Sequence, residues 1–162
     1  MMPSGLPTLP TLPTLPTLGD TVAARQIVAR YHPRTPLYAS PRLSRRYGCQ
    51  LLVKYENHAP IRSFKARGAL VSLSGLEGAS RARGVVSAST GNHGQGLAYA
   101  GGKLGIPVTI VAPTTTAPVK VAAMRDLGAD LRLEGADLAQ ATQVALTLAE
   151  HEGKVYIEDG EE

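Results

Sequence analysis

The chain contains no tryptophan, one phenylalanine and one cysteine among its 162 residues. With a single cysteine, Cys49, it cannot form an internal disulfide or a cysteine-based zinc site, which favours a reducing, cytoplasmic location. We expect Cys49 to be a small buried hydrophobic side chain. The histidines His32, His58 and His151 stand apart, and no His-x-x-x-His pair occurs, so the sequence predicts no metal site.

The chain also lacks a long hydrophobic run and a strong excess of one charge. No stretch approaches the ~18 uninterrupted apolar residues of a membrane span, so we predict no membrane partner. Lysine and arginine exceed aspartate and glutamate by 17 to 13, which gives a formal net charge of +4. This charge is mild and scattered, so we predict no nucleic-acid partner. A hydrophobic content of 43% and a charged content of 19% are typical of a globular domain.

Proline is unevenly placed, because residues 6–17 repeat the unit Leu-Pro-Thr four times. Proline at every third position fixes φ, removes backbone donors and favours a solvated polyproline II rod. We therefore predict a disordered tail over residues 1–19; a ligand for a proline-binding partner is the alternative.

The sequence predicts few helices and strands over residues 20–79. Asp20 is predicted to cap a helix that runs through Val28, and the prolines at 33 and 36 then enforce extended or turn backbone. A strand over 51–56 and a helix that starts near residue 63 follow. Because one strand and two helices cannot close a core, we predict that 20–79 is the N-terminal portion of a larger α/β domain.

From residue 80 to 162 the pattern changes to strands that alternate with helices. The predicted strands cover 85–88, 108–112, 130–133 and 155–157, and the predicted helices cover 95–104, 118–127 and 137–152. This alternation requires parallel strands with right-handed crossovers. The predicted fold is therefore α/β: an open parallel sheet with flanking helices, forming a complete small domain over 80–162 beside the portion of the larger domain.

The loop over residues 87–96 follows a predicted strand and opens a helix. Free backbone N–H groups and the helix dipole favour an anion at such a position, and three glycines allow a ligand to approach closely. Ser89, Thr90 and Asn92 add short polar groups. The glycine order, G-x-x-G-x-G, is the reverse of the dinucleotide fingerprint. An anion-binding loop and a merely tight turn both remain open.

Lys65 is the second residue of interest, because it follows Phe64 in the first turn of a predicted helix. An amine beside an aromatic ring can be desolvated and made nucleophilic. A solvated surface lysine is the alternative interpretation.

These two features, taken with shorter stretches in the same order, resemble a known family. Residues 34–158 resemble the N-terminal half of the fold-type II pyridoxal-phosphate enzymes, the tryptophan synthase β-subunit-like group, and within it the threonine/serine dehydratases and serine racemases. The matching stretches are 34–37, 43–44, 54–56, 63–69, 89–95, 104–107, Lys120 and 128–129. Two departures stand out: Arg62 occupies a position where the family often has glycine, and the family's phosphate cup lies downstream of the matched region.

The resemblance implies roles for particular residues. Lys65 corresponds to the lysine that holds pyridoxal 5'-phosphate as a Schiff base and later moves the α-proton of the substrate. Phe64 would wall the cofactor, and Asn92 would bind its ring hydroxyl. Ser89, Thr90 and His93 correspond to the loop that takes the substrate carboxylate, and Thr90 is also in the proton-handling position that is serine in the racemases.

The activity implied is β-elimination of a hydroxy amino acid such as threonine or serine, which gives a 2-oxo acid and ammonia. We expect the chain to be a truncated lyase of this kind that acts on a small amino acid. We expect the full-length form to be a homo-oligomer. The alternatives are a catalytically inactive fragment with weak anion or partner binding, and a β-replacement enzyme of the cysteine synthase kind.

Two further sets of charges are predicted to be structural. We expect Glu56 and Arg67 to form an ion pair that is not catalytic. The acidic run from Glu158 to Glu162 is predicted to be solvated tail charge.

Overall fold

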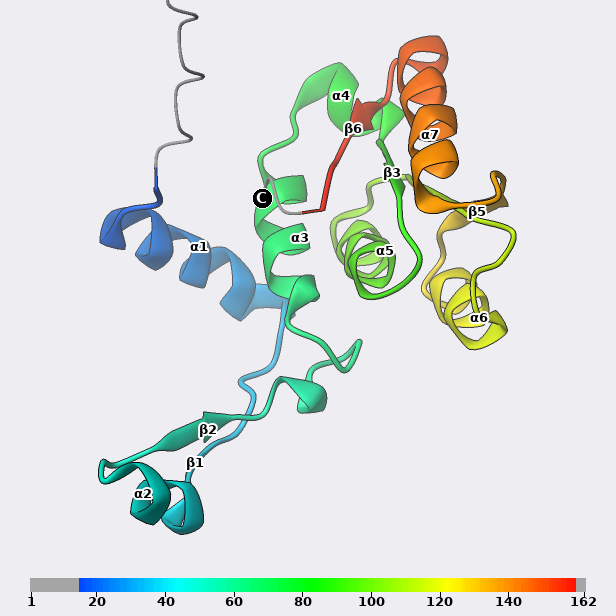
Figure 1. Ribbon diagram of the computed structural model, residues 1–162. Helices are drawn as coiled ribbons and strands as arrows, with labels where there is room; N and C mark the ends of the chain where they lie inside the picture. Colours follow the sequence, from blue (N-terminus) through cyan, green and yellow to red (C-terminus); the bar gives the residue numbers. More distant parts are fainter. Residues whose placement is uncertain (1–14, 160–162) are drawn as a thin grey trace, which may run out of the picture.

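A parallel four-stranded sheet forms the centre of the protein, and the computed structural model describes residues 15–159 (Figure 1). The strand order is β5-β4-β3-β6, and every neighbouring pair is parallel. The sheet and its helices are β3 (Val85–Ala88), α5 (Asn92–Leu104), β4 (Val108–Ala112), α6 (Pro118–Asp126), β5 (Asp130–Leu133), α7 (Leu138–Glu152) and β6 (Val155–Tyr156). The α/β fold with an open parallel sheet is therefore confirmed.

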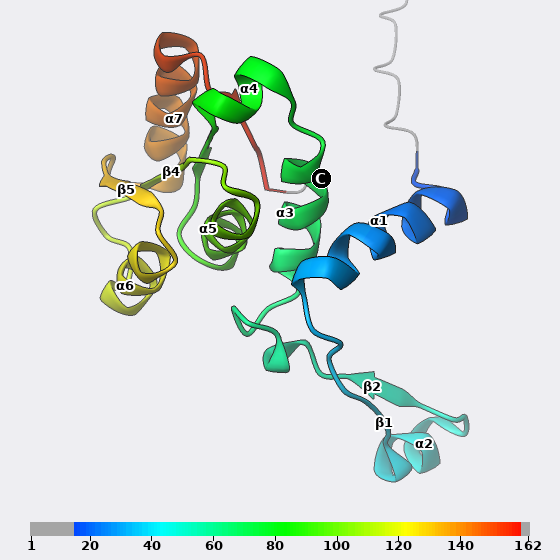
Figure 2. The ribbon, with the colours of Figure 1, turned by 180° about the vertical axis from the view of Figure 1, so that it is seen from behind.

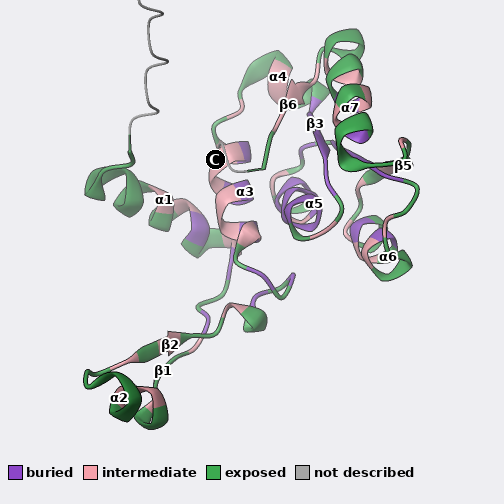
Figure 3. Ribbon diagram, in the orientation of Figure 1, coloured by how far each residue is buried: buried purple, intermediate pink, exposed green. Residues whose placement is uncertain are grey.

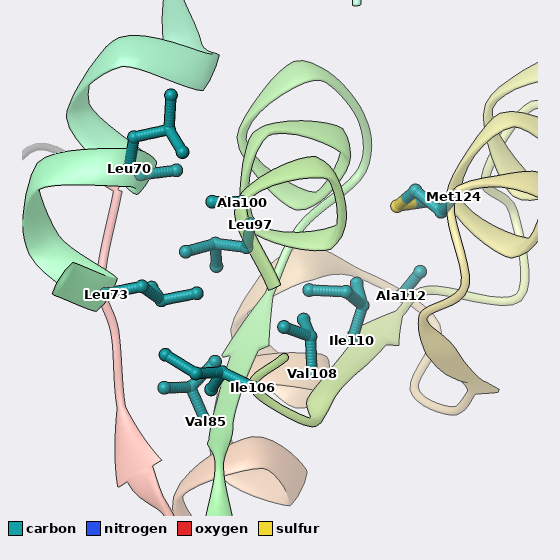
Figure 4. Packing of buried hydrophobic residues seen from close by; sticks show 11 residues of the cluster. Leu70, Leu73, Val85, Leu97, Ala100, Ile106, Val108, Ile110, Ala112 and Met124 are labelled. Carbon is teal, nitrogen blue, oxygen red and sulfur yellow. The ribbon is translucent and has the colours of Figure 1, made fainter. Parts of the chain in front are cut away.

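Alternate residues of the strands fill two hydrophobic cores on opposite faces of the sheet. Val85 and Ile110 face α5 and α6 and pack with Leu97 and Met124 (Figure 4). Their sequence neighbours Val86 and Val111 lie in a second cluster with alanines of α7. Successive side chains of a strand point to opposite faces, so near-continuous apolar strands fit a sheet that is covered on both sides.

Seven elements precede the sheet. They are α1 (Leu18–Tyr31), β1 (Leu37–Ala39), α2 (Pro41–Tyr47), β2 (Leu52–Lys54), the 3-10 turn η1 (Glu56–His58), α3 (Lys65–Ser74) and α4 (Gly78–Arg83). Helix α3 packs against α5, and its Leu70 and Leu73 are fully buried in the first core. The β1–β2 arm, an antiparallel pair with α2 at its tip, extends away from the body and is mostly exposed (Figures 2 and 3).

The structure corrects several local predictions. Asp20 is not the cap of α1: Thr17 is, and the two side chains form a reciprocal capping box. Cys49 is exposed rather than buried. Helix α5 begins at Asn92, three residues earlier than predicted. Within the predicted tail, residues 1–14 lie outside the described residues, whereas Leu18 already belongs to α1. None of the helices within residues 15–159 is long and apolar enough to cross a membrane.

An ion-pair network joins the arm to α3. Arg67 donates two hydrogen bonds to Glu56, from Nε at 2.9 Å and from Nη2 at 3.0 Å, as predicted for a structural pair. The buried hydroxyl of Thr35 donates to Glu56 Oε1 at 2.6 Å and accepts from Arg67 Nη2 at 3.2 Å. The hydrogen bond from Arg67 holds the pKa of the Glu56 carboxyl below its usual value.

We expect Glu56→Gln to lower the free energy of unfolding by about 1 kcal/mol at pH 7, because a charge-assisted bidentate pair is lost. Folding lowers the pKa of Glu56, so this stabilisation is present above the unfolded pKa of about 4.3 and is lost as the pH falls through the folded pKa. Urea unfolding at pH 7 and about pH 3 measures the difference. Glu150→Gln, at an exposed position, serves as the control. If Glu56→Gln lowers the free energy of unfolding equally at pH 7 and at about pH 3, the stabilisation does not come from the Glu56 charge.

Candidate active site

Lys65 is the first residue of α3 and lies against the first turns of α5. The close approach depends on Gly96, because a Cβ atom there would be 2.9 Å from the backbone oxygen of Lys65. The Lys65 amine is paired with the carboxylate of Asp159. The Phe64 ring, which is largely exposed, has its centroid 5.5 Å from the same nitrogen. The two candidates Lys65 and Phe64 are thus in contact.

His93 is buried in the first turn of α5 and faces the same carboxylate. Its Nδ1 is 3.6 Å from Asp159 Oδ1, and its Nε2 is 3.1 Å from the hydroxyl of Ser87 at the end of β3. Only 3% of His93 is exposed, so packing restricts the ring to this orientation. The structure therefore brings Lys65 and His93 to one carboxylate, although 28 positions separate them in the numbering of the chain.

Ser89 organises the loop between β3 and α5. Its hydroxyl oxygen accepts hydrogen bonds from the backbone N–H of Gly91, at 3.2 Å, and of Gly94, at 2.9 Å. The side chain is buried, and it satisfies donors at the start of the helix that have no partner within the helix. The Ser89 oxygen thus stabilises the loop, while the Ser89 hydroxyl can still donate its hydrogen to a further acceptor.

Thr90 and Asn92 lie on the exposed side of the same loop. Asn92 Oδ1 accepts a hydrogen bond of 2.9 Å from Lys120 Nζ, near the start of α6. This bond fixes the orientation of the amide and directs its N–H₂ group away from Lys120.

Sequence reasoning missed Asp159. The acidic run after β6 is predicted to be solvated tail charge, but its Asp159 side chain contacts Lys65 and faces His93. The segment after β6 runs toward α3, as Figure 1 shows. Nothing in the local sequence marks this contact, because it joins positions that are 94 residues apart.

Arg62 adopts a left-handed backbone conformation, with φ of 56°, three residues before Lys65. This is the position where the resembling family often has glycine. A side chain with a Cβ atom is strained in this region, whereas glycine is not. The turn is kept despite the arginine, because Arg62 N–H donates to the carbonyl of Ala59 at 2.8 Å.

We expect Arg62→Gly to raise the free energy of unfolding by about 0.5–1 kcal/mol, since the relieved strain exceeds the added freedom of the unfolded chain. Urea unfolding measures the gain. Arg62→Ala is the matched control, because it removes the charge and keeps the Cβ atom. A similar gain in both variants shows that charge, not backbone strain, is responsible.

Comparison with known proteins identifies the family to which the chain belongs. A family model described as pyridoxal-phosphate dependent enzyme matches residues 28–162. The biosynthetic L-threonine dehydratase of Escherichia coli is 41% identical over 123 residues, which cover 76% of this chain and 24% of the dehydratase. The L-threo-3-hydroxyaspartate ammonia-lyase of a Pseudomonas species is 39% identical over 138 residues, which cover 85% of this chain and 43% of the lyase.

The fold is similar as well. The crystal structure of a pyridoxal 5'-phosphate-dependent aspartate racemase has a TM-score of 0.80 and 34% identity to this chain. The match covers 90% of this chain and 46% of the racemase. The chain thus spans between about a quarter and less than half of these proteins. The family model matches most of its length, and the chain belongs to the family of pyridoxal-phosphate dependent enzymes.

Proposed function

We propose that this chain takes part in a pyridoxal-phosphate-dependent β-elimination on a hydroxy amino acid such as threonine or serine. The observation that carries the proposal is the meeting of Lys65 and His93 at one carboxylate beside the start of α5. The named activities of two relatives, a threonine dehydratase and a hydroxyaspartate ammonia-lyase, support it. The pair Asn92-His93 resembles the hydroxy-amino-acid dehydratases more than the cysteine synthases, which favours β-elimination over β-replacement.

The residues at the site fit the aldehyde and ring-hydroxyl end of the cofactor. Lys65 offers an amine, which is the group that combines with an aldehyde. The N–H₂ group of Asn92, directed away from Lys120, suits the ring hydroxyl. In the first turn of α5, the buried Nε2 of Gln95 has no hydrogen-bond partner within residues 15–159 and is a further available donor.

The cofactor, when bound, supplies a pyridine ring that accepts the electron pair left at the substrate α-carbon. Lys65 would bind the cofactor and then carry the α-proton. The hydroxyls of Ser89 and Thr90, with His93, would hold the substrate carboxylate at the positive end of α5. The substrate loses the α-hydrogen and the β-hydroxyl as water, and hydrolysis then releases ammonia and the 2-oxo acid.

We further propose that residues 20–79 belong to a larger cofactor domain and residues 80–162 to the small domain. The exposed apolar side chains of the arm support this, since Leu37, Tyr38 and Leu52 are each more than half exposed. An isolated two-stranded pair is marginally stable, and such a surface suits burial against further polypeptide. We also propose that the full-length protein forms a homo-oligomer and is located in the cytoplasm.

The test is to titrate the protein with pyridoxal 5'-phosphate, record the visible absorbance, and then add L-threonine or L-serine. We expect a saturable band that changes with substrate, and release of 2-oxo acid detected as its hydrazone. Absence of the band and of 2-oxo acid contradicts the proposal for this chain and supports an inactive fragment. Conversion of an activated serine by sulfide, without 2-oxo acid, supports β-replacement instead.

A further inference from the structure

We propose that Asp159 is a positioning residue for Lys65: its carboxylate holds the lysine in the ammonium form in front of His93, and so sets the pH at which Lys65 becomes reactive. This inference rests on the proposed function only in taking Lys65 as the lysine that binds the cofactor.

The sheet brings Asp159 to Lys65. Strand β6 pairs in parallel with β3, and Ile157 N–H donates to the carbonyl of Val86 at 3.0 Å. This bond continues the pairing beyond β6 and carries the chain along β3 toward the start of α5. Two residues later, the Asp159 carboxylate lies between α3 and α5, where it meets Lys65 and faces His93.

Within residues 15–159, the groups described near the lysine amine come from three parts of the fold. Asp159 approaches from the segment after β6, and His93 from α5 lies behind that carboxylate. On the side of α3, the Phe64 ring presents its face to the same cation. A carboxylate and an aromatic face both favour the ammonium over the neutral amine. The Lys65 side chain is only 23% exposed, which limits screening by water, although Asp159 is half exposed.

The charge state of Lys65 decides whether it can react. An ammonium has no lone pair, so the lysine must release a proton to the solvent before its nitrogen can bond to an electrophile. Asp159 therefore opposes that release until the pH rises. When Lys65 turns away from it, the carboxylate still faces His93, so the aspartate keeps a partner within the site.

The experiment measures modification of Lys65 by trinitrobenzenesulfonate as a function of pH in the cofactor-free protein, with each lysine followed by peptide mass spectrometry. The variants are Asp159→Asn and, as matched control, Glu158→Gln, which removes the same charge from the neighbouring exposed residue. The exposed Lys103 serves as internal standard for the reagent. Unfolding curves verify that both variants fold.

We expect Asp159→Asn to move the midpoint of the Lys65 profile to lower pH and to raise the rate near pH 8 by about three- to tenfold, with an unchanged plateau at high pH. Glu158→Gln should leave the profile unchanged. An unshifted midpoint in Asp159→Asn overturns the inference. So does a raised plateau without a shift, which means altered access, or an equal shift in Glu158→Gln, which means general loss of charge.

A parallel titration with pyridoxal 5'-phosphate separates this inference from the proposed function. If the wild-type protein gives no band but the Asp159→Asn profile shifts, the proposed function fails and the positioning role stands. If the band forms on Lys65 and the profile does not shift, the positioning role fails and the proposed function stands.

Discussion

Lys65→Ala is expected to abolish covalent binding of pyridoxal 5'-phosphate and to lower the release of 2-oxo acid from threonine by about 10³-fold, because one amine both binds the cofactor and carries the α-proton. The measurement is borohydride reduction of the protein–cofactor mixture followed by peptide mapping. In the wild-type protein, we expect the pyridoxyl group on the peptide that contains Lys65.

The matched control is Lys103→Ala, at the far end of α5, where the lysine contacts Tyr99 and no residue of the candidate site. This variant should bind the cofactor as the wild-type protein does. Lys120 is the rival amine, because it lies beside Asn92 in the same region. A label on Lys120 that persists in Lys65→Ala would show that the cofactor lysine is misassigned.

Gly96→Ala is expected to lower the free energy of unfolding by about 1–2 kcal/mol, although alanine is the better helix former. The added Cβ atom would meet the backbone oxygen of Lys65 at 2.9 Å and its carbonyl carbon at 3.0 Å. Both are main-chain atoms of a packed helix, so α3 must move as a unit. Urea unfolding measures the loss, and the Lys65 modification profile should change with it.

Gly102→Ala provides the control within the same helix. At Gly102 the nearest atom to an added Cβ is the Leu127 carbonyl oxygen at 3.7 Å, which is ordinary contact. This variant should therefore gain about 0.5–1 kcal/mol from helix propensity. The two alanine substitutions are expected to have opposite signs. Equal gains would mean that α3 and α5 are not closely packed at Gly96.

The sheet could be predicted from sequence because its strands are short apolar runs separated by helices of regular length. The runs at 85–88 and 108–112 match β3 and β4 residue for residue. Parallel pairing followed from the crossovers alone. The elements that were missed, β1, α2 and α4, have three to seven residues each and no clear periodicity. Strand β1 in addition forms only by pairing with β2, whose partner residues lie 13 to 17 positions away in sequence.

In the candidate site, too, local motifs could be predicted from the sequence, whereas contacts between distant segments could not. Lys65 and His93 could be identified because each lies in a distinctive local motif. Asp159 could not, since its contact with Lys65 forms only after β6 has joined β3 and brought the following segment to α3. The resemblance to a family pointed to the residues of the motifs, whereas the geometry added the carboxylate that connects them. Whether these residues have the proposed roles stays a prediction.

The shortness of β6 has a kinetic consequence. Strand β6 has two residues and forms one edge of the sheet, so it is held by few hydrogen bonds and is expected to open locally more often than β3 or β4. Each opening separates Asp159 from Lys65 while the rest of the sheet stays folded. The ion pair between Lys65 and Asp159 is thus expected to break and re-form at a rate set by local fraying of β6. Amide hydrogen exchange at Ile157 measures how often this happens.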